Sequence, residues 1–465
     1  MASFFHTLVS QKSRLALLGG LLAAVLMYWL LAQSGLSHEA RLLAGLTVLC
    51  AIWWVFEPIP IPVTSILPIA ILPLLGVIEP SAVAQSYGHP LILLLLGGFI
   101  LSMAMERSGA HRHIALIMLH LLGGGSARRV VFGFMLATAA LSMWISNTAT
   151  TLMMLPVALA VIKAGEDESI AVPLLLGICY AASIGGMGTP IGTPPNLIFM
   201  NVYEETVGKS VSFLQWMSWS VPVVIVFVPL VGFWLTRKLK NTGSFSIPDK
   251  EPWTIDQKRV LWVFAITALA WITRSEPFGG WRDLLGLASA NDASVALLAV
   301  VAMFIVPNGK GGKLLDWQTA NKIPWGMLLL FSGGIALAKA FVATGLAGAI
   351  ADQLAAFAGL PVMLMILLLC LAVTFLTEVT SNTASTSLLM PVLAAAAVGL
   401  DIDPLLLMVP AALSASCAFM LPVATVPNAV IFGSGKVTIL QMVKAGFMLN
   451  IIGVLVITVL MMRLT

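Results

Sequence analysis

Apolar runs close to the length of a membrane span recur along almost the whole chain. A helix needs roughly 20 apolar residues to cross the hydrocarbon core of a bilayer. Candidate crossings lie at residues 15–33, 41–56, 63–78, 90–108, 171–200, 216–236, 259–273, 293–307, 325–343, 404–434 and 444–462. Only 9% of the 465 residues are charged, which excludes a water-soluble fold. The pattern predicts an all-α polytopic membrane protein with about eleven crossings.

Basic residues between the crossings predict the orientation of the chain. Lys12 and Arg14 precede the first crossing, and cytoplasmic joints are enriched in lysine and arginine. Placing the N-terminus in the cytoplasm puts the C-terminus outside. The joints that then fall in the cytoplasm contain Arg107, Arg128, Arg129, Lys163, Arg237, Lys238, Lys240, Lys250, Lys258, Arg259, Lys310, Lys313 and Lys322. These joints account for the net charge of +4, so we expect no nucleic-acid partner.

Two further apolar segments, at about 134–162 and 366–397, are interrupted at their centres by small polar residues. Each is typical of a re-entrant helical hairpin, which enters the membrane and returns to the same side. Such a turn at membrane depth is tolerated only where protein buries it or where it lines a watery cavity. The two hairpin tips are therefore candidate binding sites.

The chain contains an internal repeat. Residues 145–156 (ISNTATTLMMLP) return as residues 380–391 (TSNTASTSLLMP). Upstream, the pair Gly97-Gly98 recurs as Gly333-Gly334, and downstream the sequence around Asn196 recurs around Asn428. An odd number of crossings separates the two hairpins in this interpretation, so the repeats are predicted to be inverted. Secondary transporters with inverted repeats place their sites near the middle of the membrane.

Four polar elements are predicted to converge there. They are the two hairpin tips and two helix breaks, at residues 188–196 (GTPIGTPPN) and 422–428 (PVATVPN). Broken helices present carbonyl oxygens, which suit a sodium ion, and amide N–H groups, which suit an anion. None of the four elements contains lysine or arginine. We therefore hypothesise that a bound dianion needs co-bound cations, because an uncompensated charge inside the membrane is costly.

Glu378 is the one carboxylate close to a hairpin tip. An acid inside the membrane is by default a functional candidate, and Glu378 is placed to relay protons. The alternative is a structural acid that is hydrogen-bonded near the hairpin, because the first repeat has Met143 at the equivalent position. The sequence leaves both roles open.

The paired Ser-Asn-Thr tips and the downstream breaks resemble the divalent anion/sodium symporter family, which includes sodium-coupled dicarboxylate and citrate transporters. The resemblance spans nearly the whole chain. It implies a homodimer that works by an elevator movement. It also implies that 1–126 and 237–360 supply scaffold helices, the latter after a cytoplasmic joint, and that 127–236 and 361–465 supply the mobile transport part.

The resemblance also implies a set of binding residues and at least two sodium ions. One ion would be held by Ser142, Ser146, Asn147 and the backbone of Gly192, and another by Thr377, Ser381, Asn382 and the backbone of Ala424. The substrate carboxylates would meet Asn147, Thr148, Thr193, Asn382, Thr383 and Thr425.

One position departs from the family pattern. Many relatives have Ala-Thr-Pro-Pro-Asn in the second break, whereas this chain has Val426 in place of the first of the two prolines. Because this position is expected to border the substrate, the choice among succinate, citrate and other dianions is open. The expected sodium ligands are unchanged.

The expected function is sodium-coupled symport of a C4-dicarboxylate such as succinate, with malate, fumarate and citrate as further candidate substrates. An anion exchanger on the same fold and a proton-coupled carrier are the alternatives. A membrane enzyme would need an activated nucleophile, a metal set or a paired acid and base, and the sequence presents none. The compact loops favour a bacterial inner membrane, with lipid as the surrounding partner.

Overall fold

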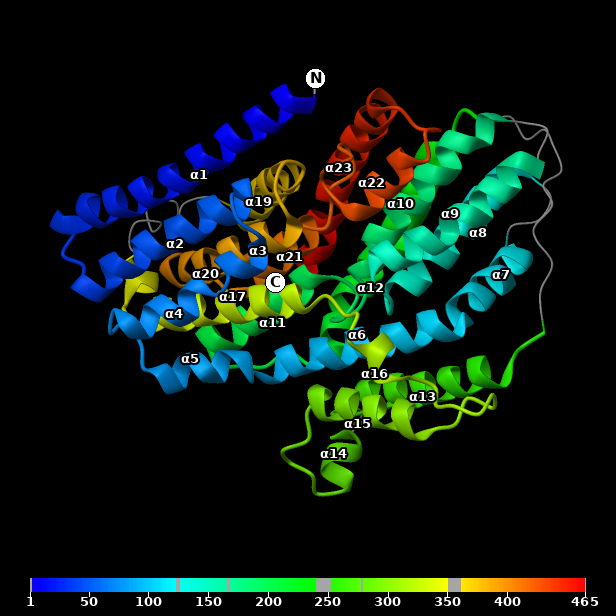
Figure 1. The fold of residues 1–465 in the computed structure, drawn as a ribbon, viewed down its shortest axis with the longest axis horizontal. Helices are drawn as coiled ribbons and strands as arrows, with labels where there is room; N and C mark the ends of the chain where they lie inside the picture. The colour runs from blue at the N-terminus through cyan, green and yellow to red at the C-terminus, as the bar shows by residue number, and fades with distance from the viewer. Residues whose placement is uncertain are drawn as a thin grey trace.

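The computed structural model describes residues 2–122, 126–164, 168–239, 252–276, 279–349 and 361–464. These residues form helices joined by short turns, and they contain no β-strand beyond an isolated bridge between Pro307 and Lys313. The prediction of an all-α protein is confirmed. Figure 1 shows an elongated helical body in which the first helix, α1 (Ala2–Leu30), lies along one side.

Eight helical segments of the described chain are long and apolar enough to cross a membrane. Besides α1, they are α2 (His38–Phe56), α6 (Pro90–Ser108) with the preceding α5 (Pro80–Tyr87), α9 (Asn147–Ala164), α12 (Phe213–Thr236), α17 (Trp325–Ala343), α20 (Asn382–Gly399) and α23 (Ile439–Met461). The polytopic architecture predicted from the apolar runs is thereby supported.

Several predicted crossings are shorter or interrupted in the structure. The segment 63–78 contains parts of two short helices, α3 (Ile61–Thr64) and α4 (Leu67–Leu74). Pro62 and Pro68 lie in the first turns of these helices, and Pro73 lies inside α4. Because proline lacks the N–H that would bond to the preceding turn, Pro68 prevents α3 from continuing into α4. The predicted crossing at 293–307 is the short helix α15 (Asp292–Ile305). The total of eleven crossings therefore stays a prediction.

Both predicted hairpins are pairs of helices joined by a four-residue tip. The first consists of α8 (Ala127–Ser142) and α9, and the second of α19 (Val362–Thr377) and α20. Their tips are residues 143–146 and 378–381. In both cases the Asn of the Ser-Asn-Thr sequence is the first residue of the second helix.

Both predicted helix breaks are present, but the second is longer than the motif suggests. The first separates α10 (Ala171–Gly186) from α11 (Pro194–Val207), and the second separates α21 (Leu405–Ser414) from α22 (Val426–Gly433). The non-helical residues are 187–193 and 415–425. The predictions that residues 188–196 and 422–428 form the breaks are wrong in their bounds, because residues 194–196 begin α11 and residues 426–428 begin α22. Pro427 lies in the first turn of α22. A backbone N–H at this position would have no partner within the helix, so proline is tolerated there.

Helices from the two halves of the chain pack against each other around these breaks. The hairpin helix α9 packs against α22, and the hairpin helix α20 packs against α11. Tyr180 of α10 contacts Phe419 of the second break, with ring centroids 5.1 Å apart. In Figure 1 these elements form the middle of the body, so segments far apart in the sequence meet there.

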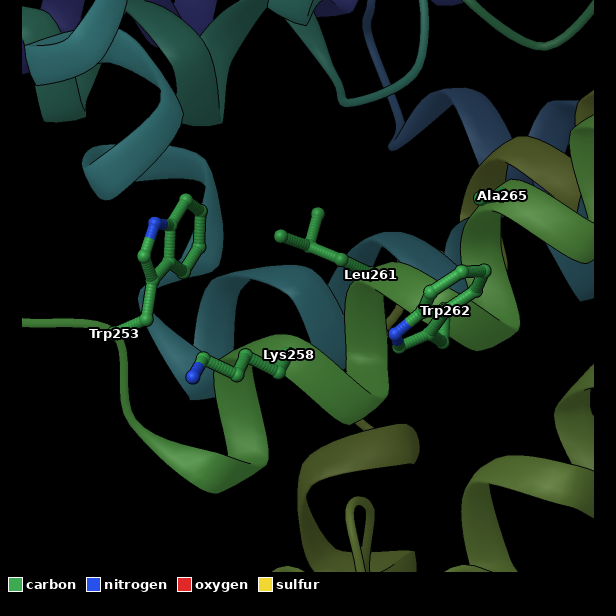
Figure 2. A pocket seen from close by; sticks show the side chains of 5 residues that line it. All are labelled: Trp253, Lys258, Leu261, Trp262 and Ala265. Carbon is green, nitrogen blue, oxygen red and sulfur yellow. The ribbon is translucent and has the colours of Figure 1, made fainter.

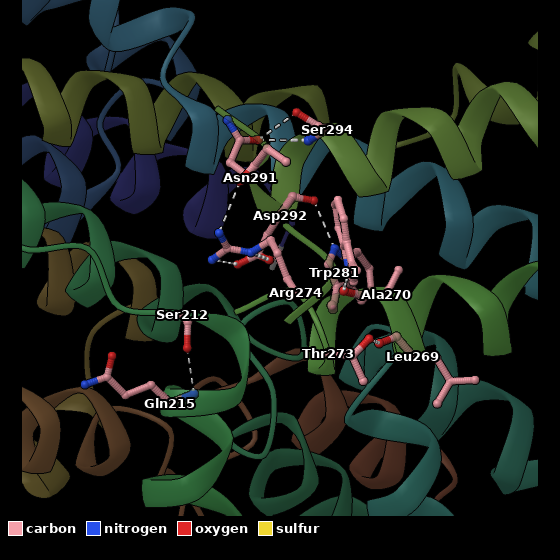
Figure 3. A network of polar contacts seen from close by, with 12 residues as sticks. Ser212, Gln215, Leu269, Ala270, Thr273, Arg274, Trp281, Asn291, Asp292 and Ser294 are labelled. Atoms are coloured by element: carbon pink, nitrogen blue, oxygen red, sulfur yellow. Dashed lines mark hydrogen bonds and ion pairs between the residues drawn. The ribbon is translucent and has the colours of Figure 1, made fainter. Parts of the chain in front are cut away.

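Another group of helices lies at one edge of the molecule (Figure 1). It contains α13 (Ile255–Ile272), α14 (Gly280–Leu284), α15 and α16 (Trp317–Ala320). Arg274 after α13 donates through Nε to Asp292 Oδ1 of α15 at 2.6 Å, and Asp292 is buried. Trp271 Nε1 also donates to the Asp292 carbonyl at 2.9 Å. This network, drawn in Figure 3, fixes the ends of α13 and α15 together.

Each Gly-Gly pair of the repeat makes two kinds of close contact. A Cβ at Gly97 would lie 2.6 Å from Ala296 of α15, and a Cβ at Gly98 would lie 3.2 Å from Ile191 of the first break. In the second half, a Cβ at Gly333 would lie 2.5 Å from the Ser65 carbonyl, and Gly334 faces Ser387 of α20. In each half, therefore, one glycine faces a break or hairpin and its neighbour faces another helix or turn.

Candidate functional site

Both hairpin tips are closed by the same hydrogen bond. Ser142, the last residue of α8, donates from Oγ to Asn147 Oδ1 at 2.6 Å. Thr377, the last residue of α19, donates from Oγ1 to Asn382 Oδ1 at 2.6 Å. The bonded residues are five apart in sequence in both tips. Each tip therefore holds a hydroxyl and an amide oxygen in contact, both of which are suitable ligands for a hard cation.

The first turn after each tip is also stabilised in the same way. Thr151 Oγ1 donates to the Asn147 carbonyl at 2.8 Å, and Thr386 Oγ1 donates to the Asn382 carbonyl at 2.7 Å. In such a bond the hydroxyl donates to the carbonyl one turn earlier in its own helix, so it needs no partner from another element. They fix the backbone of both asparagines.

An asparagine side chain closes each helix break. Asn196 Nδ2 donates to the carbonyls of Gly186 at 3.0 Å and Thr189 at 2.7 Å. Asn428 Nδ2 donates to the carbonyls of Ala418 at 3.0 Å and Leu421 at 2.8 Å. The sequence separations, ten and seven residues, are the same in both halves. Both asparagines are fully buried, so their amides replace the helical bonds that the breaks remove.

Each tip contacts the break of its own half. A Cβ at Gly186 would lie 2.5 Å from Asn147 Oδ1, and a Cβ at Gly192 would lie 2.4 Å from the Gly186 carbonyl. The first tip and the first break are therefore in close contact at these glycines. A larger residue at either position would displace the neighbouring atoms. In the second half, Thr377 Oγ1 donates to the Ala415 carbonyl at 2.9 Å, at the start of the second break.

The predicted site residues differ in exposure. Thr193, Thr383 and Ala424 are buried, with exposed fractions of 5%, 5% and 8%. Asn147, Thr148, Ser381, Asn382 and Thr425 are half-buried, and Ser146 is exposed. Val426 is 55% exposed. Ser146 Oγ accepts from the Ala149 amide at 3.2 Å, and Thr425 Oγ1 accepts from the Asn428 amide at 3.2 Å, so both hydroxyls cap the helix that follows.

Three further polar contacts were not predicted as part of the site. Trp216 Nε1 and Ser220 Oγ of α12 donate to the carbonyls of Met187 at 2.9 Å and Gly188 at 3.1 Å. Cys179 Sγ of α10 donates to Asn428 Oδ1 at 2.8 Å and so joins the two halves. No motif surrounds these residues. In contrast, the recurrence of Asn196 as Asn428 was visible in the sequence and marked them as equivalent.

A groove of about 340 Å³ runs along α13 (Figure 2). Its lining residues are Trp253, Lys258, Leu261, Trp262 and Ala265. It contains none of the predicted ligands, and its walls are largely apolar side chains. Buried side-chain amides, hydroxyls and non-helical carbonyls are concentrated at the tips and breaks, which we therefore consider the candidate site.

Known proteins resemble this chain in sequence. The family model of the citrate transporters matches residues 51–409. The chain belongs to this family. It is 39% identical to a protein of Staphylococcus saprophyticus named sodium-dependent dicarboxylate transporter SdcS, over 94% of this chain and 88% of that protein. A protein of the same name from Staphylococcus aureus is 38% identical over 91% of this chain and 85% of its own length.

A structural comparison supports the fold of this citrate transporter family member. The YdaH transporter of Alcanivorax borkumensis has a TM-score of 0.56 at 13% identity and covers 84% of this chain and 87% of its own. The family resemblance found in the sequence is confirmed, and the chain is a membrane transporter rather than an enzyme. Sodium-coupled transport of dicarboxylates is supported by the relatives named for it.

Proposed function

We propose that this protein is a sodium-coupled symporter of a C4-dicarboxylate such as succinate. The observation that carries the proposal is the matched pair of tips, in which Ser142 with Asn147 and Thr377 with Asn382 present the same two oxygens. The relatives named sodium-dependent dicarboxylate transporters are consistent with both the cation and the anion class. Malate, fumarate and citrate are the other candidate substrates.

At each tip, sodium would take the place of a hydrogen bond. The hydroxyl proton of Ser142 points to Asn147 Oδ1, and rotation of that hydroxyl would free both oxygens for a cation. Ser146 and the Gly192 carbonyl complete the first proposed ligand set. In the second set, Ser381 and the Ala424 carbonyl join Thr377 and Asn382. Two ions is the minimum that neutralises a dianion.

The dicarboxylate would bind between the two tips through neutral donors. The proposed contacts are the amides of Asn147 and Asn382 and the hydroxyls of Thr148, Thr193, Thr383 and Thr425, with Val426 at the border. Tips and breaks contain no lysine or arginine. The sodium ions therefore supply the positive charge that makes dianion binding favourable, and coupling follows from this electrostatic requirement.

The transport step is proposed to be an elevator movement of an inverted-repeat protein. The hairpins, the broken helices α10–α11 and α21–α22, and the helices α12 and α23 would form the mobile part. Gly98 and Gly334 would lie on its boundary with the scaffold, where small residues let helices approach and slide. We place the N-terminus in the cytoplasm and the C-terminus outside, in a bacterial inner membrane, and propose a homodimer joined through scaffold helices.

The test is uptake of radiolabelled succinate by the purified protein in liposomes at fixed pH. An inward sodium gradient is compared with potassium alone and with liposomes preloaded with succinate. We expect uptake into unloaded liposomes only with sodium. Uptake that requires internal succinate identifies an exchanger, and uptake driven by a pH gradient without sodium identifies a proton-coupled carrier. Competition by malate, fumarate and citrate then ranks the substrates.

A further inference from the structure

Glu378 in the second tip is a buried carboxylate with an unusual set of partners. Its side chain is only 3% exposed. Oε1 accepts from the amides of Phe419 at 2.7 Å and Met420 at 2.9 Å, and Oε2 accepts from the amides of Met420 and Leu421, both at 3.1 Å. Asn450 Nδ2 of α23 donates to Oε1 at 2.8 Å. Both oxygens are thus occupied by donors.

This hydrogen-bond pattern fits the acceptor capacity of a carboxylate. A protonated carboxyl would direct an O–H toward N–H groups that need an acceptor, and it would leave at least one buried amide without a partner. Three successive backbone amides form a concave anion site of the kind that stabilises a negative charge. Glu378 therefore has no free lone pair toward a cation and no free position for a transferred proton.

The three amides belong to the break that carries the second proposed sodium site. Phe419, Met420 and Leu421 lie within the non-helical residues 415–425. The Leu421 carbonyl in turn accepts from the Ala424 amide at 3.2 Å and from Asn428 Nδ2 at 2.8 Å. The carboxylate therefore fixes the backbone from one side and Asn428 from the other, immediately before Ala424 and Thr425.

We propose that Glu378 is a positioning residue for the second cation site. It holds the break so that the Ala424 carbonyl and the Thr425 hydroxyl face the tip formed by Thr377 and Asn382, and it does not relay protons. This inference rests on the proposed function, because it assigns the carboxylate to one of the two sodium sites. Its structural part, the fixation of residues 415–425, holds independently of any transported ion.

The first repeat provides a structural comparison for Glu378. Met143 has the position of Glu378, and its side chain packs against Gly188, where a Cβ would lie 2.9 Å from the methionine methyl carbon. The first break therefore has no carboxylate at this position. Its carbonyls at Met187 and Gly188 are fixed instead by Trp216 and Ser220 of α12.

The decisive measurement compares Glu378→Gln, Glu378→Asp and Asn450→Ala with Asn291→Ala and the unmodified protein in liposomes. In Glu378→Gln an amide N–H₂ faces the N–H donors of the break, so we expect the half-saturating sodium concentration to rise roughly tenfold. The succinate KM at saturating sodium should change less than about twofold. Asn450→Ala should raise the sodium requirement about threefold. Asn291→Ala, which removes the N-cap of α15 outside the candidate site, should leave it unchanged.

Two further readouts separate positioning from other roles. Amide hydrogen exchange should increase in residues 415–425 of Glu378→Gln and stay unchanged in residues 187–193, and this result does not depend on transport. The pH profile of uptake, measured at constant dianion concentration, should have the same shape in Glu378→Gln and the unmodified protein. Unchanged exchange together with an unchanged sodium curve overturns the proposal, as does a pH dependence that disappears with Glu378. If the unmodified protein shows no sodium dependence while the exchange result holds, only the proposed function fails.

Discussion

The two helix breaks reach the same geometry by different chemistry. In both, an asparagine bridges carbonyls ten and seven residues earlier. The first break is tightly packed through glycines at 186 and 192 and is supported by donors from α12. The second has Ala418 where the first has Gly186, and its support comes from the Glu378 carboxylate and from Asn450 of α23.

The difference separates the residues that the site itself needs from those that hold it. The tip asparagines, their hydroxyl partners and the bridging asparagines occur in both halves. The supporting contacts do not: steric fit is used on one side and a buried charge on the other. A residue that recurs in both repeats is therefore the better candidate for contact with ions or substrate, and a residue present in one repeat is the better candidate for support.

The largest effect is expected from removal of the shared asparagines. Asn147→Ala and Asn382→Ala each remove a proposed sodium ligand, a substrate contact and the acceptor of the tip hydrogen bond. We expect each variant to lose at least about 100-fold in sodium-driven succinate uptake, because changes to the ligand environment of an ion already cost 10- to 100-fold in affinity. Asn291→Ala, which removes the cap of α15, is the control and should transport normally. Wild-type uptake in either tip variant would contradict the equivalence of the two halves.

The second effect tests the steric support of the first break. Gly186→Ala introduces a Cβ that would lie 2.5 Å from Asn147 Oδ1, so the asparagine must move. We expect the half-saturating sodium concentration to rise roughly tenfold or more, as overpacking of a tight core position does. The mirror variant Ala418→Gly creates no clash and should stay within about twofold of the unmodified protein. Equal effects of the two variants would mean that both breaks are equally tight.

The third effect concerns the hydroxyl partners of the tips. The single hydroxyl proton of Thr377 is within reach of two acceptors, Asn382 Oδ1 and the Ala415 carbonyl, whereas that of Ser142 has one acceptor, Asn147 Oδ1. Loss of a net hydrogen bond costs about 1 kcal/mol, so Ser142→Ala should raise the sodium requirement about fivefold. Thr377→Ala, which leaves two acceptors without a donor, should raise it by about fivefold to 20-fold. Thr377→Ser retains the hydroxyl and should behave like the unmodified protein. A larger effect for Ser142→Ala than for Thr377→Ala would contradict this ranking of the two hydroxyls.

Much of the fold follows from the sequence because bilayer length and helix-breaking residues are local properties. The long apolar helices lie within or overlap the predicted runs, and in each predicted hairpin the turn lies directly before the Asn of the Ser-Asn-Thr sequence. The repeat in the sequence also relates Asn147 to Asn382. The bounds of the second break were missed because its first residues, 415–421, contain no proline or glycine. They are held out of the helix by Glu378 and Asn428, and such long-range partners leave no periodic pattern.

The partners from other helices were missed for the same reason. Trp216, Ser220 and Cys179 bond to the breaks or to the asparagine that closes one, from α12 and α10, and Asn450 of α23 bonds to Glu378 in the second tip. A single buried polar residue in an apolar helix has no sequence signature that distinguishes it from one that bonds within its own helix. The roles of Glu378 that the sequence left open could only be weighed once its five hydrogen bonds were known.

The smallest effect is expected at the border of the proposed substrate site, where the first half has a proline and the second half has a valine. The first residue of α11 is Pro194, whereas the first residue of α22 is Val426, which is 55% exposed. Val426→Pro fits the first turn of a helix without loss of a hydrogen bond, so the sodium dependence should not change. Because one partly exposed apolar side chain is altered, we expect the ratio of succinate to citrate KM to shift about two- to threefold, or about 0.5 kcal/mol. Pro194→Val is the mirror variant. A shift only in Val426→Pro assigns selectivity to the second break, equal shifts in both variants place the substrate symmetrically between the breaks, and an unchanged ratio removes Val426 from the substrate border.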